Sequence, residues 1–362
     1  MLFYLAMILM LPPFFYCFRK NENGDRIVLS IACFYMFIIL ALRSPKMGID
    51  LPTYYGIFED INKLSFRELI SAFGIIKIHE PVHYEWGYCF VSWIIGRIGL
   101  GFQSFLILQA AFCAFSTFWF IDRNSSDVVL SFALIIAFGL FDYAFSTLRQ
   151  ALSLSILLFA IGPLRKRKIF LFVVIVVLAM LMHRTAIVLF LAFPLSFIPV
   201  NRKWVIAFCG ASLCIVLVFP YIAKIIKGLL ALFSKEGNFQ VSQFDFKEMF
   251  VGVLFVALFL VFFADEKKLT DTDKSLFWVF MLAIPIEAIA CYYTLLTRIS
   301  TLTLLPFAAV AIPNFVKTNS DEKKVKLFLI LIYAAAVFYY IVVTVWDLRL
   351  IRILPYRVFF LD

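Results

Sequence analysis

Apolar stretches follow one another along nearly the whole chain and leave only short polar segments between them. Apolar residues make up 64% of the 362 residues and charged residues only 15%, whereas a soluble domain has about 45–50% and about 25%. A membrane-spanning helix needs roughly 20 apolar residues, so this composition provides for about eleven or twelve spans. It excludes a nucleic-acid-binding domain, a coiled coil and a large soluble catalytic domain. The chain is predicted to be an all-α, polytopic integral membrane protein.

The apolar runs predict about twelve spans within a single domain that covers residues 1–362. They are expected to be helices because a lipid-exposed chain must satisfy its backbone hydrogen bonds internally, and no run alternates like a barrel strand. The first run has no basic segment before it and no small-residue cleavage site, so it is read as an uncleaved span. The predicted spans are 2–18, 27–42, 101–121, 128–145, 149–164, 169–182, 185–199, 204–223, 248–264, 275–296, 299–316 and 327–346.

Short basic loops connect the predicted spans at every second turn of the chain. The most basic of these loops is the run from Arg165 to Lys168. By the positive-inside rule these loops are cytoplasmic. The periplasmic face then carries both termini, the long segment 43–100, the loop 224–247 and the tail 347–362. This topology requires that the apolar stretch 86–98 does not cross the membrane, and we expect a re-entrant or interfacial helix there.

The predicted periplasmic face is relatively rich in arginine. It holds nine Arg and seven Lys, whereas the cytoplasmic loops hold six Arg and eleven Lys. Guanidinium groups bind phosphate or carboxylate through paired hydrogen bonds and stay charged when desolvated, which favours an anionic ligand at this face. For any single arginine, snorkelling of an interfacial side chain is an equal alternative.

Five groups of polar residues converge on the predicted periplasmic face. They lie in ALRSPKMGIDLPTYYGIF, HEPVHYEWGY, FDYAFSTLRQAL, LAMLMHRTAIV and, together, YYTLLTRIS with ILPYRVFF. Their candidate residues are Arg43, Asp50 and Tyr54; Glu85 and Tyr88; Arg149 and Gln150; His183 and Arg184; and Arg298, Tyr356 and Arg357.

The residues His79, Glu80 and His83 spell HExxH, a zinc-protease motif that requires both histidines on one face of a helix. Pro81 argues against that helix, because proline is tolerated only in the first helical turn and would leave His79 outside it. The seven cysteines form no CxxC pair. We expect neither a metal site nor a cofactor.

In order along the chain, these motifs resemble the EpsG-like branch of the Wzy family of bacterial O-antigen and exopolysaccharide polymerases. The resemblance rests on Arg43 with a following G-x-D-x-x-x-Y-x-x-x-F run, and then on E-x-G-Y, R-Q-A-L, H-x-[ST]-A, R-I and a closing P-Y that ends at Tyr356. The chain departs from the family pattern at Ile49, where a small polar residue is usual, and at Leu51, where threonine is usual.

The resemblance implies a glycosyltransferase of the bacterial inner (cytoplasmic) membrane with its active site on the periplasmic side. Such an enzyme transfers a growing glycan from undecaprenyl diphosphate onto the non-reducing end of a new lipid-linked repeat unit. Donor and acceptor are then both undecaprenyl-diphosphate-linked oligosaccharides, and neither nucleotide sugar nor nucleic acid takes part. Implied partners are membrane lipids, a chain-length regulator and a flippase of the same pathway.

For such a reaction, the arginines are expected to stabilise the negative charge on the diphosphate leaving group. Aromatic rings such as Tyr54, Tyr88 and Tyr356 would stack on sugars, with an ordinary interfacial aromatic belt as the alternative. The base that removes the proton from the acceptor hydroxyl remains open among the catalytic candidates, Asp50, Glu85 and His183. Asp142 is expected to form a structural ion pair with Arg149.

Two other functions are compatible with the sequence. A flippase or transporter of lipid-linked oligosaccharide would also have many spans and embedded charges, but it predicts internal repeats, which the sequence does not show. Another carrier-lipid glycan transferase, such as an O-antigen ligase, would use a similar donor. An O-acyltransferase would need a His and an Asp in an acyl tunnel, for which only His183 is available.

Overall fold

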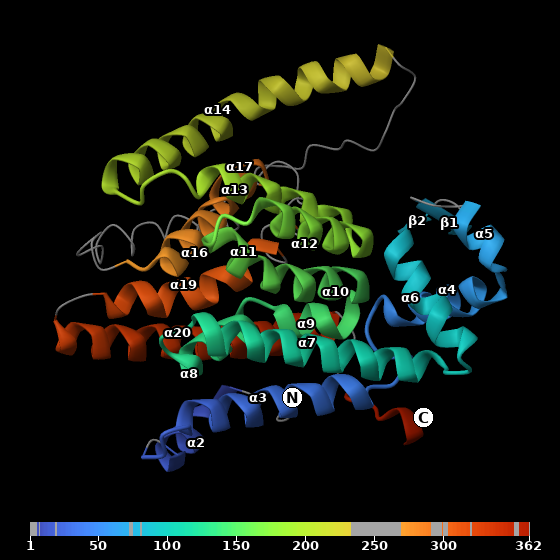
Figure 1. Cartoon of the computed structure of the whole chain (residues 1–362), viewed down its shortest axis with the longest axis horizontal. Coiled ribbons are helices and arrows are strands. Elements are labelled where there is room, and N and C mark those ends of the chain that lie inside the picture. The colour runs from blue at the N-terminus through green and yellow to red at the C-terminus, as the bar shows by residue number, and fades with distance from the viewer. Residues whose placement is uncertain are drawn as a thin grey trace.

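The computed structural model describes residues 6, 8–18, 20–71, 75–79, 82–232, 269–290, 299, 303–318, 321–350 and 355–361. Within these residues the protein is a bundle of helices with a single two-stranded hairpin (Figure 1). The predicted all-α class is confirmed.

The first half of the chain forms the core of the bundle. Helix α3 (Gly24–Leu42) packs on α7 (Phe102–Asn124), and α10 (Leu148–Leu157) packs on both α7 and α12 (Ile169–Met182). The remaining elements here are α2 (Leu11–Phe18), α8 (Val128–Ala137), α9 (Leu140–Ser146), η1 (Leu158–Ala160) and α11 (Ile161–Arg165).

The second half of the chain packs around this core. Helix α19 (Leu305–Lys317) lies against α8 and α16 (Asp271–Met281), and α20 (Glu322–Leu350) also packs on α8. The remaining elements here are η2 (Arg184–Leu191), α13 (Ala192–Leu195), α14 (Arg202–Leu232), α17 (Ala283–Ala290) and η6 (Phe359–Leu361).

A small subdomain covers one end of the bundle, beside the start of α7 (Figure 1). It has its own apolar core, in which Tyr54, Phe58 and Tyr88 pack with Phe105 of α7. Its elements are α4 (Leu51–Lys63), α5 (Phe66–Ser71), the antiparallel strands β1 (Ile75–His79) and β2 (Val82–Glu85), and α6 (Trp86–Arg97).

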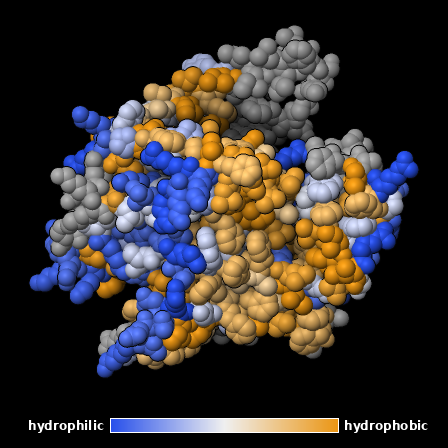
Figure 2. All heavy atoms as spheres, in the orientation of Figure 1, coloured by the Kyte–Doolittle hydropathy of each residue, from blue (hydrophilic) through white to orange (hydrophobic). Residues whose placement is uncertain are grey.

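Among the described residues, five helices are long and apolar enough to cross a membrane, or six if the bent pair α8 and α9 counts as one span. The pair bends by 50° at Gly139, whose φ of +85° lies in the left-handed region that favours glycine. An apolar belt crosses the middle of the surface in Figure 2, with hydrophilic side chains gathered toward the ends. The five helices are Gly24–Leu42, Phe102–Asn124, Leu148–Arg165, Arg202–Ile222 and Glu322–Val342.

The number of twelve spans is not confirmed. Predicted span 185–199 begins with the 3-10 helix η2, and 275–296 breaks at Leu282 between α16 and α17. At 1.5 Å per residue, the 14-residue α12 extends only about 21 Å, which is less than the roughly 30 Å hydrocarbon core. Span 248–264 lies outside the described residues.

The stretch 86–98 forms the 12-residue helix α6, which at about 18 Å is too short to cross. It packs against α4, α7 and α12. This packing brings the residue before α6, Glu85, to the end of α12.

Candidate active site

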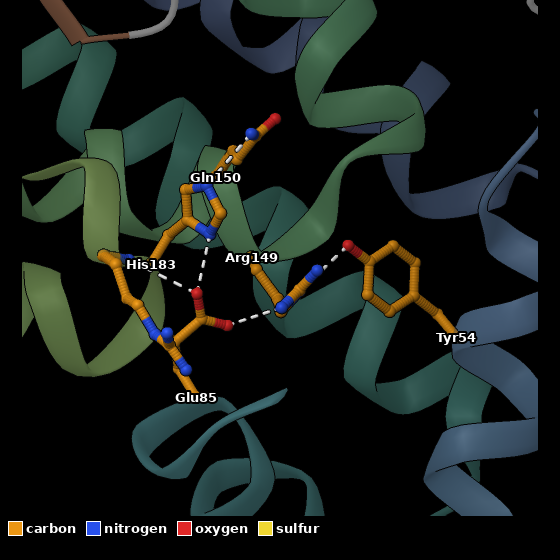
Figure 3. Close-up of polar contacts among 6 residues, drawn as sticks. Tyr54, Glu85, Arg149, Gln150 and His183 are labelled. Atoms are coloured by element: carbon orange, nitrogen blue, oxygen red, sulfur yellow. Dashed lines mark hydrogen bonds and ion pairs between the residues drawn. The ribbon is translucent and has the colours of Figure 1, made fainter. Parts of the chain in front are cut away.

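Three predicted site residues, each from a different element, lie in contact, and the carboxylate of one of them, Glu85, binds the other two. Glu85 ends β2, Arg149 lies in the first turn of α10, and His183 follows α12. One oxygen of Glu85, Oε2, lies 2.5 Å from Arg149 Nη1, and the other, Oε1, lies 2.9 Å from His183 Nδ1 (Figure 3). Oε1 also accepts a hydrogen bond of 3.3 Å from the backbone N–H of Arg184. Glu85 is thus a buried ionic hub.

Local structure explains why these side chains can meet. His183 has an extended backbone, with φ −158° and ψ 128°, so α12 ends at Met182 and the chain turns into η2. Gly87 allows the close approach of α6, because a Cβ at this position would lie 2.7 Å from the backbone oxygen of Leu181. The glycine of the E-x-G-Y motif therefore brings Glu85 beside His183.

The hydrogen bonds with Glu85 and Gln150 determine which tautomer the His183 ring adopts. An ionised carboxylate can only accept hydrogen bonds, so Nδ1 of His183 carries the proton that Glu85 binds. The other ring nitrogen, Nε2, lies 3.0 Å from Nε2 of Gln150, and the Gln150 amide donates to it. His183 Nε2 is therefore an acceptor and a potential base.

Arg149 is held from several sides. Its Nε donates to the hydroxyl of Tyr54 at 3.2 Å, and its guanidinium carbon lies 4.6 Å from the ring centre of Tyr84. Nη2 has no hydrogen-bond partner within the part of the chain that the structure describes. The arginine is thus rigidly positioned and keeps a donor group available for a ligand.

These residues surround a cavity of about 230 Å³. The Oε1 atom of Gln150 is buried and has no hydrogen-bond partner among the described residues. Buried polar atoms are normally paired, so this unpaired acceptor is an exception within the site. The lining residues are Asp50, Thr53, Tyr54, Tyr84, Thr147, Arg149, Gln150 and His183.

Asp50 reaches the cavity from a turn. Gly48 has a φ of +72°, which glycine adopts at little cost, and the backbone N–H of Asp50 points to Ser146 Oγ at 3.5 Å. Asp50 precedes α4, but its side chain does not cap this helix. The G-x-D motif thus places a carboxylate at the cavity.

The Glu85 carboxylate is strongly acidic. Burial acts to raise its pKa, but the hydrogen bond with His183 and the positive charge of Arg149 outweigh burial and lower the pKa to about 2. In contrast, burial raises the pKa of Tyr54 above its usual value, although Arg149 opposes the shift. Glu85 is therefore ionised at neutral pH and Tyr54 is a neutral hydroxyl.

A second group of predicted residues forms a structural clamp. Arg43 is fully buried and donates to Gln109 Oε1 at 3.0 Å and to the backbone oxygens of Ala144 and Leu40. Tyr356 donates to the backbone oxygen of Ile39 at 2.8 Å, and the exposed Arg357 accepts from Ser44 N–H through its own backbone oxygen. These residues tie the C-terminal segment to α3, and none of them lines the cavity.

The other predicted residues have different locations. Tyr88 is fully buried and packs behind Tyr54, with ring centres 5.5 Å apart. Arg184 has an exposed side chain and contributes its backbone N–H. Arg298 lies outside the described residues. The prediction that Asp142 pairs with Arg149 is wrong, because the partner of Arg149 is Glu85.

Sequence reasoning missed three residues that line the cavity, namely Thr53, Tyr84 and Thr147. Each lies within two positions of a predicted site residue, so proximity in sequence was the available signal. Tyr84 is the most informative of them, because its ring covers the Arg149 guanidinium.

The HExxH residues His79 and His83 lie on the paired strands β1 and β2. The motif needs a helix to place both rings on one face, so the zinc-protease geometry is not formed there. Within the described ranges, no group of three or more His, Cys, Asp or Glu side chains could hold a metal ion.

Comparison with known proteins gives one match. The model of the EpsG family matches residues 26–358, nearly the whole chain and all the motifs above. No curated protein and no solved structure matches. The family match and the apolar helices together identify a membrane protein. The chain belongs to the EpsG family, a Wzy-like polymerase family.

Proposed function

We propose that this protein polymerises O-antigen or exopolysaccharide at the periplasmic face of the bacterial inner membrane. The growing glycan leaves its undecaprenyl diphosphate carrier and is joined to the non-reducing end of a new lipid-linked repeat unit. The observation that supports this proposal best is the buried hub of Glu85, Arg149 and His183 beside a polar cavity, in a chain of the EpsG family.

In the proposed reaction, the acceptor hydroxyl oxygen attacks the anomeric carbon of the donor sugar. The bond from that carbon to the diphosphate oxygen breaks, and its electron pair leaves with the diphosphate. His183 Nε2 takes the hydroxyl proton, since Glu85 holds Nδ1–H and stabilises the imidazolium that forms. Gln150 releases Nε2 when the acceptor binds.

The negative charge that develops on the diphosphate is assigned to Arg149. Its Nε and Nη1 groups are fixed by Tyr54 and Glu85, whereas Nη2 remains available. A donor fixed in advance stabilises a transition state without the cost of reorganisation. Arg184 and Arg298 are proposed as further diphosphate ligands.

Asp50 is assigned to the donor sugar, where a carboxylate stabilises positive charge on the anomeric carbon. Glu85 is a positioning residue, because a carboxyl with a pKa of about 2 is too weak a base at neutral pH. At about 230 Å³, the cavity is smaller than the roughly 300–1,000 Å³ of typical ligand sites. It accommodates the reacting groups, and the rest of both glycans lies outside.

The test is reconstitution of the purified protein in vesicles that contain the lipid-linked repeat unit. Polymerase activity produces a ladder of longer lipid-linked glycans together with released undecaprenyl diphosphate. Movement of the repeat unit across the vesicle membrane without a new linkage indicates a flippase. In cells, a deletion strain with a single repeat on the lipopolysaccharide core supports the polymerase, whereas complete loss of O-antigen indicates a ligase or flippase.

A further inference from the structure

A second cavity, of about 420 Å³, lies at the other end of the Leu148–Arg165 span. Arg149 begins this span at the candidate active site, and Arg165 ends it at the second cavity. Sixteen residues of helix separate the two, about 24 Å at 1.5 Å per residue. The two cavities therefore lie at opposite ends of this candidate span. The second cavity is lined by Trp119, Arg123, Asn124, Phe159, Gly162, Pro163, Arg165, Lys166, Lys168, Leu171 and Ile175.

Four cations line this cavity and no acidic residue does. Arg165 donates to Thr272 Oγ1 at 2.6 Å and is thereby fixed against α16. In the described part of the chain, no carboxylate pairs with Arg123, Lys166 or Lys168. A concave surface with this charge attracts an anion.

The backbone conformation of the basic run Arg165–Lys168 turns its side chains toward two different sides. Arg167 has a positive φ of 51°, and its guanidinium carbon lies 4.3 Å from the ring centre of Phe197, away from the cavity. Lys166 and Lys168, on either side of it, line the cavity. A non-glycine residue in this backbone region is uncommon, so the arrangement is more specific than a simple charged loop.

Aromatic rings hold Arg123 in place. Its guanidinium carbon lies 5.4 Å from the ring centre of Trp119, and Trp119 packs on Phe159 with ring centres 4.6 Å apart. A stacked guanidinium keeps its hydrogen-bonding edges free for an oxyanion.

The cavity continues into an apolar surface. Leu171 is 45% exposed, and Ile175 one turn later also lines the cavity. On the same helix, Phe170, Val173 and Val177 are exposed large hydrophobic side chains. A ligand that fits both parts has an anionic group and a hydrocarbon chain.

We infer that this cavity binds the phosphate headgroup of an anionic glycerophospholipid, with an acyl chain along α12. Basic pockets between spans at a cytoplasmic surface favour such headgroups, and the predicted topology places Arg165–Lys168 on the cytoplasmic side. Free phosphate has the same anionic chemistry, but it would gain nothing from Leu171 and Ile175. The inference does not depend on the proposed polymerase activity.

Gly162 offers a direct test. A Cβ at this position meets nothing within 4 Å, so Gly162→Leu fills the cavity without a backbone clash. Gly210→Leu on α14 is the matched control, because Gly210 also faces open space and does not line the cavity. The melting temperature of each purified protein is measured in neutral detergent with added phosphatidylglycerol, phosphatidylcholine or inorganic phosphate.

We expect phosphatidylglycerol to raise the melting temperature of the wild type and of Gly210→Leu by a few degrees, and to leave Gly162→Leu unchanged. Phosphatidylcholine and inorganic phosphate should give no such shift. An equal shift for Gly162→Leu and the wild type overturns the proposal. An equal shift with inorganic phosphate alone overturns the lipid as the occupant.

The charge requirement is tested by Lys166→Gln with Lys168→Gln, against Lys323→Gln with Lys326→Gln. Both pairs are exposed and remove the same charge from the same predicted membrane face. The apparent affinity for phosphatidylglycerol, measured by native mass spectrometry, should fall about tenfold or more in the first pair only. An equal fall in both pairs would show nonspecific attraction to the basic face and overturn the site.

Discussion

Glu85 Oε1 lies 2.9 Å from His183 Nδ1, although the two residues are 98 positions apart in the chain. This contact joins the hairpin subdomain to the end of α12, and the second oxygen of Glu85 adds Arg149 of α10. One carboxylate thus fixes both the candidate base and the candidate ligand of the diphosphate. Loss of its charge should affect both at once.

Replacing Glu85 by Gln is expected to abolish polymerisation. The neutral amide can no longer compensate the charge of Arg149 or hold the His183 ring in one tautomer. The unfolding free energy should fall by about 1–3 kcal/mol, because a buried charged group loses its partner. Activity in the reconstituted assay and thermal unfolding measure the two effects. Wild-type activity in this variant would remove Glu85 from the site.

The low pKa of Glu85 has a defined effect on stability. A carboxyl with a pKa lowered from 4.5 to about 2 contributes stability that is fully present above pH 4.5 and is lost as pH falls through 2. The stability difference between the wild type and Glu85→Gln should therefore shrink as the pH falls below about 4. Thermal unfolding between pH 5 and 2 measures this loss, and a difference that does not shrink over this range would contradict the assignment.

Arg149 provides a second prediction. Arg149→Ala should reduce polymerisation by about 100-fold or more at normal protein levels, and Arg149→Lys should restore only part of the activity. Lysine is a point charge whose single nitrogen lacks the planar fork that binds Tyr54 and Glu85 through separate nitrogens. Full activity in the alanine variant would place the diphosphate site elsewhere.

Much of the candidate site could be predicted from the sequence, because its residues lie in short motifs with a fixed order. Asp50, Tyr54, Arg149, Gln150 and His183 all line the cavity. The sequence alone could not separate Arg43 from these residues. Arg43 and Arg149 both lie at the end of a predicted span, and only the fold shows that Arg43 is fully buried and bound to backbone oxygens.

The number of spans and the partner of Arg149 were not predictable in the same way. Hydropathy reports apolar length but not backbone conformation, so the bend at Gly139 could not be recognised, whereas the short length of 185–199 already indicated tilt or a break where η2 forms. Asp142 was the nearest acidic residue in sequence, whereas Glu85 reaches Arg149 through tertiary packing of α6 on α12. Contacts between segments that are distant in the sequence cannot be predicted from a local sequence pattern.

His183→Gln should abolish glycan extension without preventing folding. Glutamine retains hydrogen bonding but cannot accept a proton, so a base is expected to lose a factor of about 10²–10⁴ in rate. His79→Gln and His83→Gln are the matched controls, since these histidines lie on the hairpin strands rather than at the end of α12. Loss of the glycan ladder in the two controls alone would revive the metal site.

The orientation of the chain can be tested with a reporter enzyme that is active only in the periplasm. Fusion after Lys166 should give no activity and fusion after Gly99 should give full activity. Lys166 lies at the basic end of the Leu148–Arg165 span, and Gly99 follows α6, which is too short to cross. The reverse pattern would place the candidate active site on the cytoplasmic side.

The last prediction concerns the approach of α6 to α12. Gly87→Ala adds a methyl group that would lie 2.7 Å from the backbone oxygen of Leu181, so the two helices must move apart. Because Glu85 directly precedes α6, this movement should lengthen its contacts with His183 and Arg149 and lower both activity and melting temperature.

Gly56→Ala is the control for this substitution. Gly56 also lies in a helix of the subdomain, but a Cβ there meets nothing within 4 Å. Removing a helical glycine should then stabilise the protein by about 0.5–1 kcal/mol. Opposite shifts in melting temperature for the two variants would show that Gly87 serves the close contact that positions Glu85. Equal shifts would mean that α6 can adjust without disturbing the hub.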